Sequence, residues 1–234
     1  MFVMKKIRLV IFDVNQTMFS LNKIENELAK LGVNPKFCDI WFNSVLKEGF
    51  ALYNLSKFIP FKDIGISVLT NILYEKKIRN SKKISKKIMK GFNKLKPVDG
   101  LRESLETFNL WDIKMATLTN GNKDTTYELL VNNNLNKFIT KTFSINDVGC
   151  WKPSPETYLM VTKHFDVKPE NTLMVSCHSW DLEEAKNVGL QIGFINGTSG
   201  VLPEYYHSPD YQGKNILELS KNVLKAQRNF VTSI

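Results

Sequence analysis

Five short apolar runs recur along this chain, and helical stretches separate them. Each run has the length of a strand, and several are bounded by Gly, Asn or Pro, which favours buried β-strands. The alternation of strand and helix predicts an α/β protein with a doubly wound, parallel, Rossmann-like sheet. The five runs are Ile7 to Phe12, Ala116 to Thr119 with Ile113 before it, Thr142 to Ile145, Thr172 to Ser176 and Ile192 to Ile195.

Residues 20–96 lack this alternation and instead contain four helical stretches with apolar residues at helical spacing. The first runs from about Lys23 to Leu31, two more follow Pro35 and Pro60, and the fourth extends from Ser81 to Leu95. Such a segment is longer than an ordinary crossover between strands. We therefore expect an all-helical cap at residues 20–96, inserted after the first strand of an α/β core formed by residues 1–19 and 97–234.

The apolar segments and the cysteines limit where such a chain is found. No run of about 18 apolar residues is present, so no transmembrane helix is expected. The run before Asp13 is too short for the apolar part of a signal peptide, which favours a cytoplasmic protein. The three cysteines are not closely paired, which argues against a disulfide framework or a zinc site.

The net charge of +9 comes mostly from lysine, because only four of the 32 basic residues are arginines. A nucleic-acid-binding protein usually gathers Arg and Lys with aromatic residues on one face. Here the lysines are spread widely, with a denser stretch from Lys76 to Lys96. We interpret this stretch as a solvated helix face and expect neither a nucleic-acid nor a membrane partner.

Chemically active residues follow four of the five apolar runs. In a doubly wound sheet, ligands bind at the carboxyl ends of the strands. An Asp after a strand is often a helix cap and a lone Lys is usually solvated, but four such coincidences in order favour a catalytic site. The residues at these ends are Asp13, Thr119, Asn120, Lys152, Ser176, His178 and Asp181.

Four segments resemble, in order, the four motifs of the haloacid-dehalogenase-like hydrolases: residues 13–17 (DVNQT), 118–121 (LTNG), 152–158 (KPSPETY) and 176–181 (SCHSWD). The third and fourth are closest to the type II, or L-2-haloacid, dehalogenase branch. The resemblance extends from Ile7 to about Gly197. The helical segment lies where this family carries its cap.

Two departures separate the branches of this family. Its phosphatases usually place a second Asp two residues after the nucleophile as general acid, and this chain has Asn15 there. They also begin the fourth motif with an Asp that holds magnesium, and this chain has Ser176. Because magnesium prefers carboxylate and other hard oxygen ligands, we expect no metal and no other cofactor. A small-molecule phosphatase, a non-catalytic protein that retains the fold and a basic binding module remain alternatives.

The resemblance implies a two-step covalent mechanism. Asp13 attacks the carbon that carries the leaving group and forms an ester, while Lys152 keeps Asp13 ionised. Asp181 then activates or orients the water that hydrolyses the ester. A further set of residues is expected to bind the small-molecule substrate or to shape its pocket. These residues are Asn15, Thr17, Phe42, Thr119, Asn120, Ser176, His178 and Trp180.

Two positions bear on the expected substrate, a small 2-halo carboxylic acid that yields a 2-hydroxy acid. The best-known members of the branch have Tyr at the position of Asn15 and an Arg after the cap Trp that binds the leaving halide. In this chain Phe42 follows Trp41. Phe42 either lines a halide pocket or fills the cap core. By the same resemblance, a homodimer through the cap helices is expected.

Overall fold

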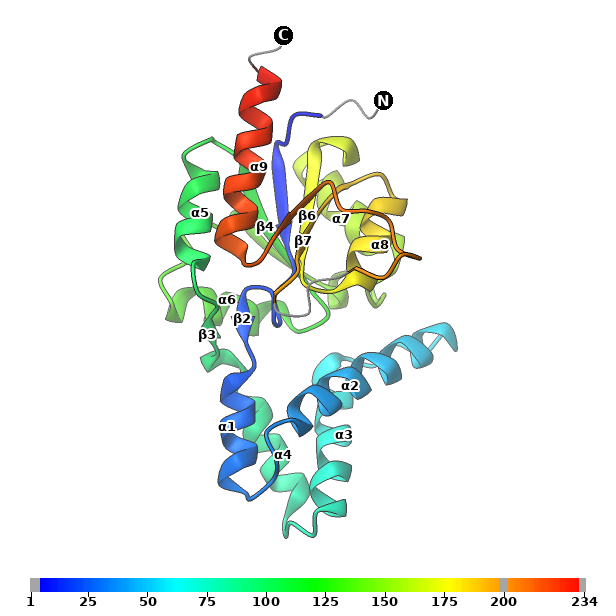
Figure 1. Cartoon of the computed structure of the whole chain (residues 1–234). Helices are drawn as coiled ribbons and strands as arrows, with labels where there is room; N and C mark the ends of the chain where they lie inside the picture. The colour runs from blue at the N-terminus through cyan, green and yellow to red at the C-terminus, as the bar shows by residue number, and fades with distance from the viewer. Residues whose placement is uncertain (1–4, 198–201, 232–234) are drawn as a thin grey trace.

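The central sheet contains six parallel strands in the order β5-β4-β1-β6-β7-β8 (Figure 1). The structure is a computed structural model that describes residues 5–197 and 202–231. The parts of the expected core at residues 1–4, 198–201 and 232–234 lie outside the described residues. The predicted parallel α/β sheet is confirmed. Its strands are β1 (Leu9–Phe12), β4 (Lys114–Thr119), β5 (Lys141–Ser144), β6 (Thr172–Ser176), β7 (Gln191–Ile195) and β8 (Tyr211–Gly213).

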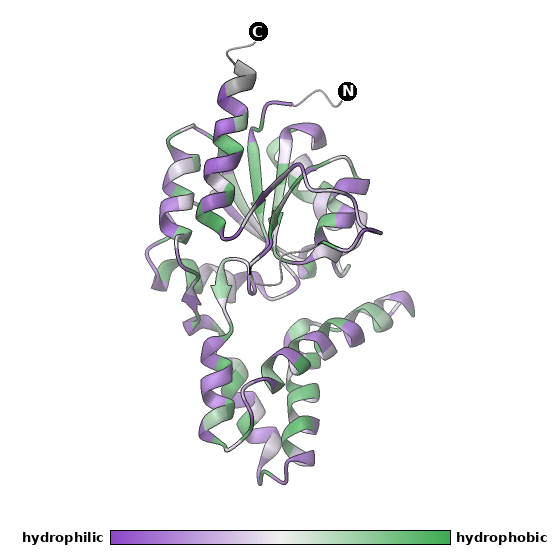
Figure 2. Ribbon diagram, viewed as in Figure 1, coloured by the Kyte–Doolittle hydropathy of each residue, from purple (hydrophilic) through white to green (hydrophobic). Residues whose placement is uncertain are grey.

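Helices cover both faces of the sheet, as Figure 1 shows for α5 and α9 on one side and α7 and α8 on the other. Successive side chains of β1 point to opposite faces. Val10 and Phe12 belong to one hydrophobic cluster and Leu9 and Ile11 to another. Burial on both faces explains why the central strands are continuously apolar (Figure 2). The helices of this part are α5 (Leu101–Asn109), α6 (Lys123–Asn132), α7 (Pro155–Phe165), α8 (Ser179–Asn187) and α9 (Ile216–Val231), with short 3₁₀ turns η2 (Ile145–Asp147) and η3 (Pro169–Asn171).

Residues 22–94, here called the helical insertion, contain four α-helices and a final 3₁₀ turn. A two-stranded antiparallel ribbon joins the ends of the insertion to the sheet. None of the helices within residues 5–197 and 202–231 is long and apolar enough to cross a membrane. The elements are α1 (Asn22–Lys30), α2 (Phe37–Asn54), α3 (Phe61–Glu75), α4 (Ser81–Lys90) and η1 (Gly91–Lys94), with the ribbon strands β2 (Phe19–Ser20) and β3 (Lys96–Pro97).

One expected helix boundary needs correction. The fourth helix of the insertion ends at Lys90 instead of reaching Leu95, because the chain tightens into the 3₁₀ turn that begins at Gly91. In the core, α8 begins at Ser179. Asp181 therefore lies in the first turn of α8.

The helical insertion packs over the carboxyl ends of the strands and shares a hydrophobic cluster with one face of the sheet. Two buried tryptophans fix the insertion, one inside it and one at the junction with the sheet. The Trp41 Nε1 donates a hydrogen bond to the Gly65 carbonyl at 2.9 Å, and the Trp151 Nε1 donates to the Ile59 carbonyl at 3.0 Å. Because Trp151 follows β5 and Ile59 precedes α3, the second bond joins the insertion to the sheet.

Replacing Gly49 with Ala is expected to loosen this junction. A Cβ at position 49 would lie 2.5 Å from the indole ring of Trp151. Overpacking of this kind costs about 1–3 kcal/mol, which exceeds the ~0.5–1 kcal/mol that Ala gains over Gly in a helix. Urea unfolding should show lower stability for Gly49→Ala.

The matched control is Gly91→Ala, since a Cβ at Gly91 meets only the Lys23 side chain at 3.5 Å. It should change the free energy of unfolding by less than about 0.5 kcal/mol. Equal effects of the two substitutions would contradict the tight packing of α2 on Trp151.

Candidate active site

Asp13 lies at the carboxyl end of the central strand. Phe12, the last residue of β1, pairs with Thr117 in β4 and with Val175 in β6. The Asp13 backbone N–H donates to the Val175 carbonyl at 3.0 Å, so the strand ends directly before the carboxylate turns into the site. Gln16 then adopts a left-handed φ of 65°, which reverses the chain. The reversal lets the Thr17 hydroxyl donate to Asp13 Oδ2 at 2.8 Å.

Lys152 is fully buried between two carboxylates. Its Nζ lies 3.0 Å from Asp13 Oδ1 and 2.7 Å from Asp181 Oδ2. The ammonium also donates to the Leu118 carbonyl at 3.1 Å. The ammonium therefore makes two hydrogen bonds, to Asp13 and to the Leu118 carbonyl, and an ion pair with Asp181. The ammonium is thereby held in one position beside both carboxylates.

Asn120 fixes the backbone from which Lys152 projects. Its side-chain Oδ1 accepts a hydrogen bond from the Lys152 backbone N–H at 2.9 Å, and its Nδ2 donates to the Lys152 carbonyl at 3.4 Å. Asn120 follows β4, whereas Lys152 lies in the loop after β5 and η2. The amide therefore links two neighbouring strand ends and positions the lysine.

Burial and charge act against each other in this group. Burial opposes the charged form of Lys152, but Asp13 and Asp181 outweigh this effect and raise the pKa of the ammonium. Burial raises the pKa of Asp181, and the ion pair with Lys152 only partly opposes that shift. The Tyr158 hydroxyl donates to Asp181 Oδ1 at 2.7 Å. Burial, followed by the charge of Asp181, raises the pKa of Tyr158 well above its ordinary value, so the hydroxyl keeps its proton.

His178 brings a second cation towards the nucleophile. Its Nε2 lies 3.6 Å from Asp13 Oδ2 and donates to the Asn15 carbonyl at 3.2 Å. Burial lowers the pKa of this imidazole, but Cys177, Asp13 and Asp181 raise it more, to about 9. The neighbouring negative groups therefore favour the protonated form of the ring.

Aromatic rings hold the imidazole from both parts of the structure. Phe42, on α2, stacks on His178 with ring centroids 5.7 Å apart and an interplanar angle of 26°. Trp180, in the first turn of α8, stacks on His178 at 5.4 Å and 18°. Phe42 thus contacts the site itself and is not confined to the interior of the helical insertion.

Three hydroxyl-bearing residues order the loops around Asp13. The Ser176 Oγ accepts from the His178 backbone N–H at 3.1 Å, and the Thr119 Oγ1 accepts from the Gly121 N–H at 2.9 Å. The Thr17 Oγ1 accepts from the Cys177 N–H at 3.2 Å in addition to its bond to Asp13. These bonds connect the loops after β1 and β6 and shape the loop after β4.

A small cavity of about 50 Å³ lies between the sheet and the helical insertion. Asn15 and Thr119 line it from the strand ends, and Phe61, Met89 and Phe92 line it from the insertion. Lys62 also lines the cavity from the insertion, so its wall is polar at the strand ends and carries a cation among apolar residues opposite. No cluster of three or more His, Cys, Asp or Glu side chains suited to a metal ion occurs among the described residues.

The structure adds two groups that sequence reasoning did not select for the site. Helical spacing placed Tyr158 on the buried face of α7, and only its position in the third motif pointed towards chemistry. The Leu118 carbonyl has no sequence signal, because any residue supplies such an oxygen. Both reach the charged group only because α7 and β4 pack beside β1.

Comparisons with known proteins show which proteins this chain resembles. The family model for haloacid dehalogenase-like hydrolases matches residues 10–195. The haloacetate dehalogenase H-2 of Moraxella sp. (strain B) is 23% identical over 89% of this chain and 94% of its own length. The (S)-2-haloacid dehalogenase 4A of Burkholderia cepacia is 24% identical over 94% and 98%, respectively.

A solved structure has the same fold. The L-2-haloacid dehalogenase from Xanthobacter autotrophicus, with chloropropionic acid covalently bound, aligns with a TM-score of 0.84 at 20% identity. The alignment covers 93% of this chain and 98% of that structure.

Replacing Lys152 with Met should destabilise the fold strongly. The substitution leaves Asp181 buried without a counter-ion, which costs about 3–5 kcal/mol. Without the ion pair that opposes it, burial raises the pKa of Asp181 further, so the folded state binds more protons than the unfolded state. The stability of Lys152→Met should consequently increase as the pH falls from neutral towards the ordinary carboxyl range, measured by urea unfolding at several pH values.

The control is the double variant Lys152→Met/Asp181→Asn, which removes the uncompensated charge. It should recover part of the lost stability at neutral pH. If Lys152→Met were as stable as the wild type at neutral pH, the fold would not depend on this buried ion pair.

Proposed function

Because this chain belongs to the haloacid dehalogenase-like hydrolases, we propose that it displaces halide from small 2-halo carboxylic acids to give 2-hydroxy acids. The observation that carries the proposal is the Lys152 ammonium paired with both Asp13 and Asp181 at the carboxyl ends of the strands. The relatives named haloacetate and (S)-2-haloacid dehalogenases support this substrate class. Asn15 and Ser176 stand where the phosphatases of the family carry carboxylates, so the proposed reaction is metal-independent.

In the first step, a carboxylate oxygen of Asp13 attacks C2 of the haloacid. The new C–O bond forms an ester as the carbon–halogen bond breaks, and the bonding pair leaves with the halide. Lys152 keeps Asp13 ionised, and the Thr17 hydroxyl orients the carboxylate through Oδ2. Halide is a good leaving group and needs no proton, which agrees with an amide at Asn15.

In the second step, water attacks the Asp13 carboxyl carbon of the ester. The bond between this carbon and the alkyl oxygen breaks, and the 2-hydroxy acid leaves with one proton of the water. The other proton passes to Asp181 and then to solvent, while the water oxygen remains in the regenerated carboxylate. Burial raises the pKa of Asp181, which suits a general base. The Tyr158 hydroxyl holds its orientation.

In this proposal, His178 binds the anionic groups of the reaction. Both the substrate carboxylate and the departing halide are anions, and the Lys152 ammonium is already paired with two carboxylates. The imidazolium is the remaining cation beside Asp13 within residues 5–197 and 202–231. Phe42 and Trp180 hold its ring, and Thr119, Asn120 and Ser176 order the adjacent loops. Asn15 and Thr119 face the cavity that receives the substrate.

Three broader assignments accompany the reaction. Residues 20–96 form the cap, and residues 1–19 and 97–234 form the core. The protein is cytoplasmic, in agreement with its three free cysteines, because disulfides are rare in reducing compartments.

The protein forms a homodimer, which light scattering after size-exclusion chromatography should detect as twice the 26.9 kDa chain mass. A monomer at working concentration would contradict the last assignment.

Replacing Asp13 with Asn should abolish halide release from haloacids. An amide oxygen is a far poorer nucleophile than a carboxylate, so kcat/KM should fall by about 10⁴-fold or more. Ion-selective or chromatographic detection of halide gives the measurement, and unchanged thermal unfolding shows that the fold is retained. Full activity of Asp13→Asn in freshly purified protein would refute covalent catalysis by this residue.

Replacing Asn15 with Asp separates dehalogenase from phosphatase chemistry. A second carboxylate beside Asp13 disfavours an anionic substrate, so haloacid turnover should fall or stay level. Phosphate release from a generic phosphate ester, assayed with and without magnesium, should stay negligible. A magnesium-dependent gain of about 10²–10⁴-fold, the size of a general-acid effect, would place the protein among the phosphatases.

The affinity for haloacid should depend on the charge of His178. The imidazolium is present below a pKa of about 9 and is lost as the pH rises through that value, so KM should increase above pH 9. His178→Asn removes the charge at every pH. It should raise KM at neutral pH by about 10- to 100-fold, the size of a charged hydrogen bond, and remove the pH dependence of KM above neutral pH. An unchanged alkaline limb in the variant would assign the titration to another group.

A further inference from the structure

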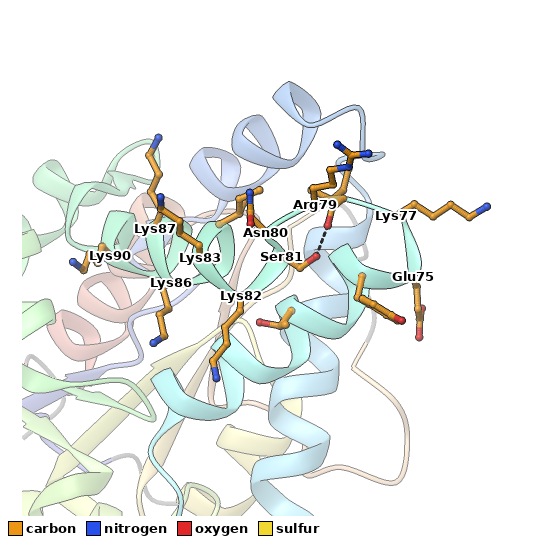
Figure 3. A pocket seen from close by; sticks show the side chains of 14 residues that line it. Glu75, Lys77, Arg79, Asn80, Ser81, Lys82, Lys83, Lys86, Lys87 and Lys90 are labelled. Carbon is orange, nitrogen blue, oxygen red and sulfur yellow. Dashed lines mark hydrogen bonds between the residues drawn. The ribbon is translucent and has the colours of Figure 1, made fainter.

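A groove on the outside of the helical insertion carries a feature that the proposed reaction does not use. The C-terminal part of α3, the turn at residues 76–80 and α4 form its walls, and its volume is about 1560 Å³. Figure 3 shows its lining side chains, with Lys82 and Lys86 extending to one side of α4 and Lys87 to the other. The face of α4 that packs inward contributes Met89 to the catalytic cavity. The groove is therefore a separate surface of the same helix.

All of the net positive charge of the chain is concentrated here. Residues 76–96 contain ten basic side chains and no acidic one, whereas the remaining 22 basic and 23 acidic residues give a charge of −1. Seven of the ten basic side chains line the groove, with Glu75 as its single acidic residue. The lysine-rich stretch at residues 76–96 is therefore a local patch of positive charge, because the charges of the rest of the chain nearly cancel.

Few of these charges have a favourable partner in the described fold. None of the ten basic side chains forms an ion pair with a carboxylate among residues 5–197 and 202–231, and Lys76 instead lies 4.2 Å above the Phe37 ring. Lys82 and Lys86 repel each other one helical turn apart, as do Lys83 and Lys87. Lys82 and Lys83 also occupy the first turn of α4, where the helix dipole disfavours cations. Most of these cations therefore lack a close carboxylate within the described residues.

The floor of the groove is apolar. Ile78 and Ile84 are half-buried in it, and Tyr74 is 78% exposed at its edge. The lysine side chains add their methylene groups to the walls and keep their ammonium groups in water. The occupant must therefore be narrow enough to enter a groove and must present both apolar groups and anions.

We propose that this groove binds an acidic segment of a partner protein that carries apolar side chains between its carboxylates. Apolar side chains of such a segment cover Ile78, Ile84 and Tyr74, and its carboxylates pair with the lysines at the rim. An amphipathic segment lying in a groove is a common mode of peptide recognition. This inference does not depend on the proposed reaction.

Other occupants match fewer of these features. A second copy of this chain placed symmetrically on the groove would bring the two basic stretches together, so like charges would repel. A lipid surface is broad, whereas the groove is concave, and the apolar side of α4 is already packed inside the insertion through Ile88 and Met89. A nucleic acid offers phosphates, but Tyr74 is the only aromatic residue that lines the groove for base stacking.

The test uses a fluorescein-labelled helical peptide with Glu and Leu on opposite faces, and fluorescence anisotropy measures its binding to the full chain. A peptide with Gln in place of Glu and an oligoglutamate without Leu are the ligand controls. The groove variant is Lys82→Gln/Lys83→Gln/Lys86→Gln/Lys87→Gln. Its matched control is Lys57→Gln/Lys168→Gln/Lys221→Gln/Lys225→Gln, which removes the same charge from exposed lysines elsewhere. Circular dichroism and thermal unfolding verify that both variants fold.

The proposal requires that the Glu–Leu peptide binds more tightly than either control peptide and that added salt weakens its binding. The groove variant should lose affinity by about tenfold or more, and the control variant by less than about twofold. Equal losses in both variants would overturn the proposal, because net charge alone would then explain binding. Tighter binding of a single-stranded oligonucleotide, or of phosphatidylserine–phosphatidylcholine vesicles, would also overturn it.

Discussion

The buried ammonium of Lys152 between Asp13 and Asp181 is the interaction on which the candidate site depends. Removing three charges from water costs several kcal/mol for each ion, and closely placed, well-oriented ion pairs must offset that cost. The sheet provides the geometry, since β1 lies between β4 and β6 and places Asp13 beside their ends. Asn120 fixes the backbone of Lys152, and Tyr158 fixes Asp181. The surrounding strands therefore position all three charges before a substrate arrives.

The helical insertion completes the site from the opposite side. Phe61, Met89 and Phe92 close the small cavity, which excludes water and strengthens electrostatic interactions inside it. Phe42 stacks on His178, so the insertion also orients a charged group of the core. The same helix that supplies Met89 carries the basic groove on its outer side. Cavity and groove thus share α4 but use opposite faces.

The charge of the site is nearly balanced. The Lys152 ammonium and the His178 imidazole lie beside the Asp13 and Asp181 carboxylates, so two basic groups face two acidic ones. This balance bears on the missing cap arginine. Phe42 occupies the position after Trp41, and in place of a cation it supplies an aromatic face to the imidazolium. In the proposed reaction, the anion-binding charge therefore comes from α8 and the loop before it.

The sequence alone determined the strand–helix alternation, the helical insertion and the order of chemically active residues at the strand ends, because these are local patterns. Apolar runs identify β1, β4 and β6 directly, and the parallel sheet then brings Asp13, Lys152 and Asp181 to one edge. The three-residue strand β8 and the two-residue ribbon of β2 and β3 are too short for a periodic signal. Only the tertiary structure decided that the Tyr158 hydroxyl meets Asp181 and that Phe42, His178 and Trp180 stack. Tyr158 and Asp181 meet because α7 and α8 pack on the same sheet, and Phe42 reaches His178 because the insertion packs on the strand ends. No local pattern encodes either packing.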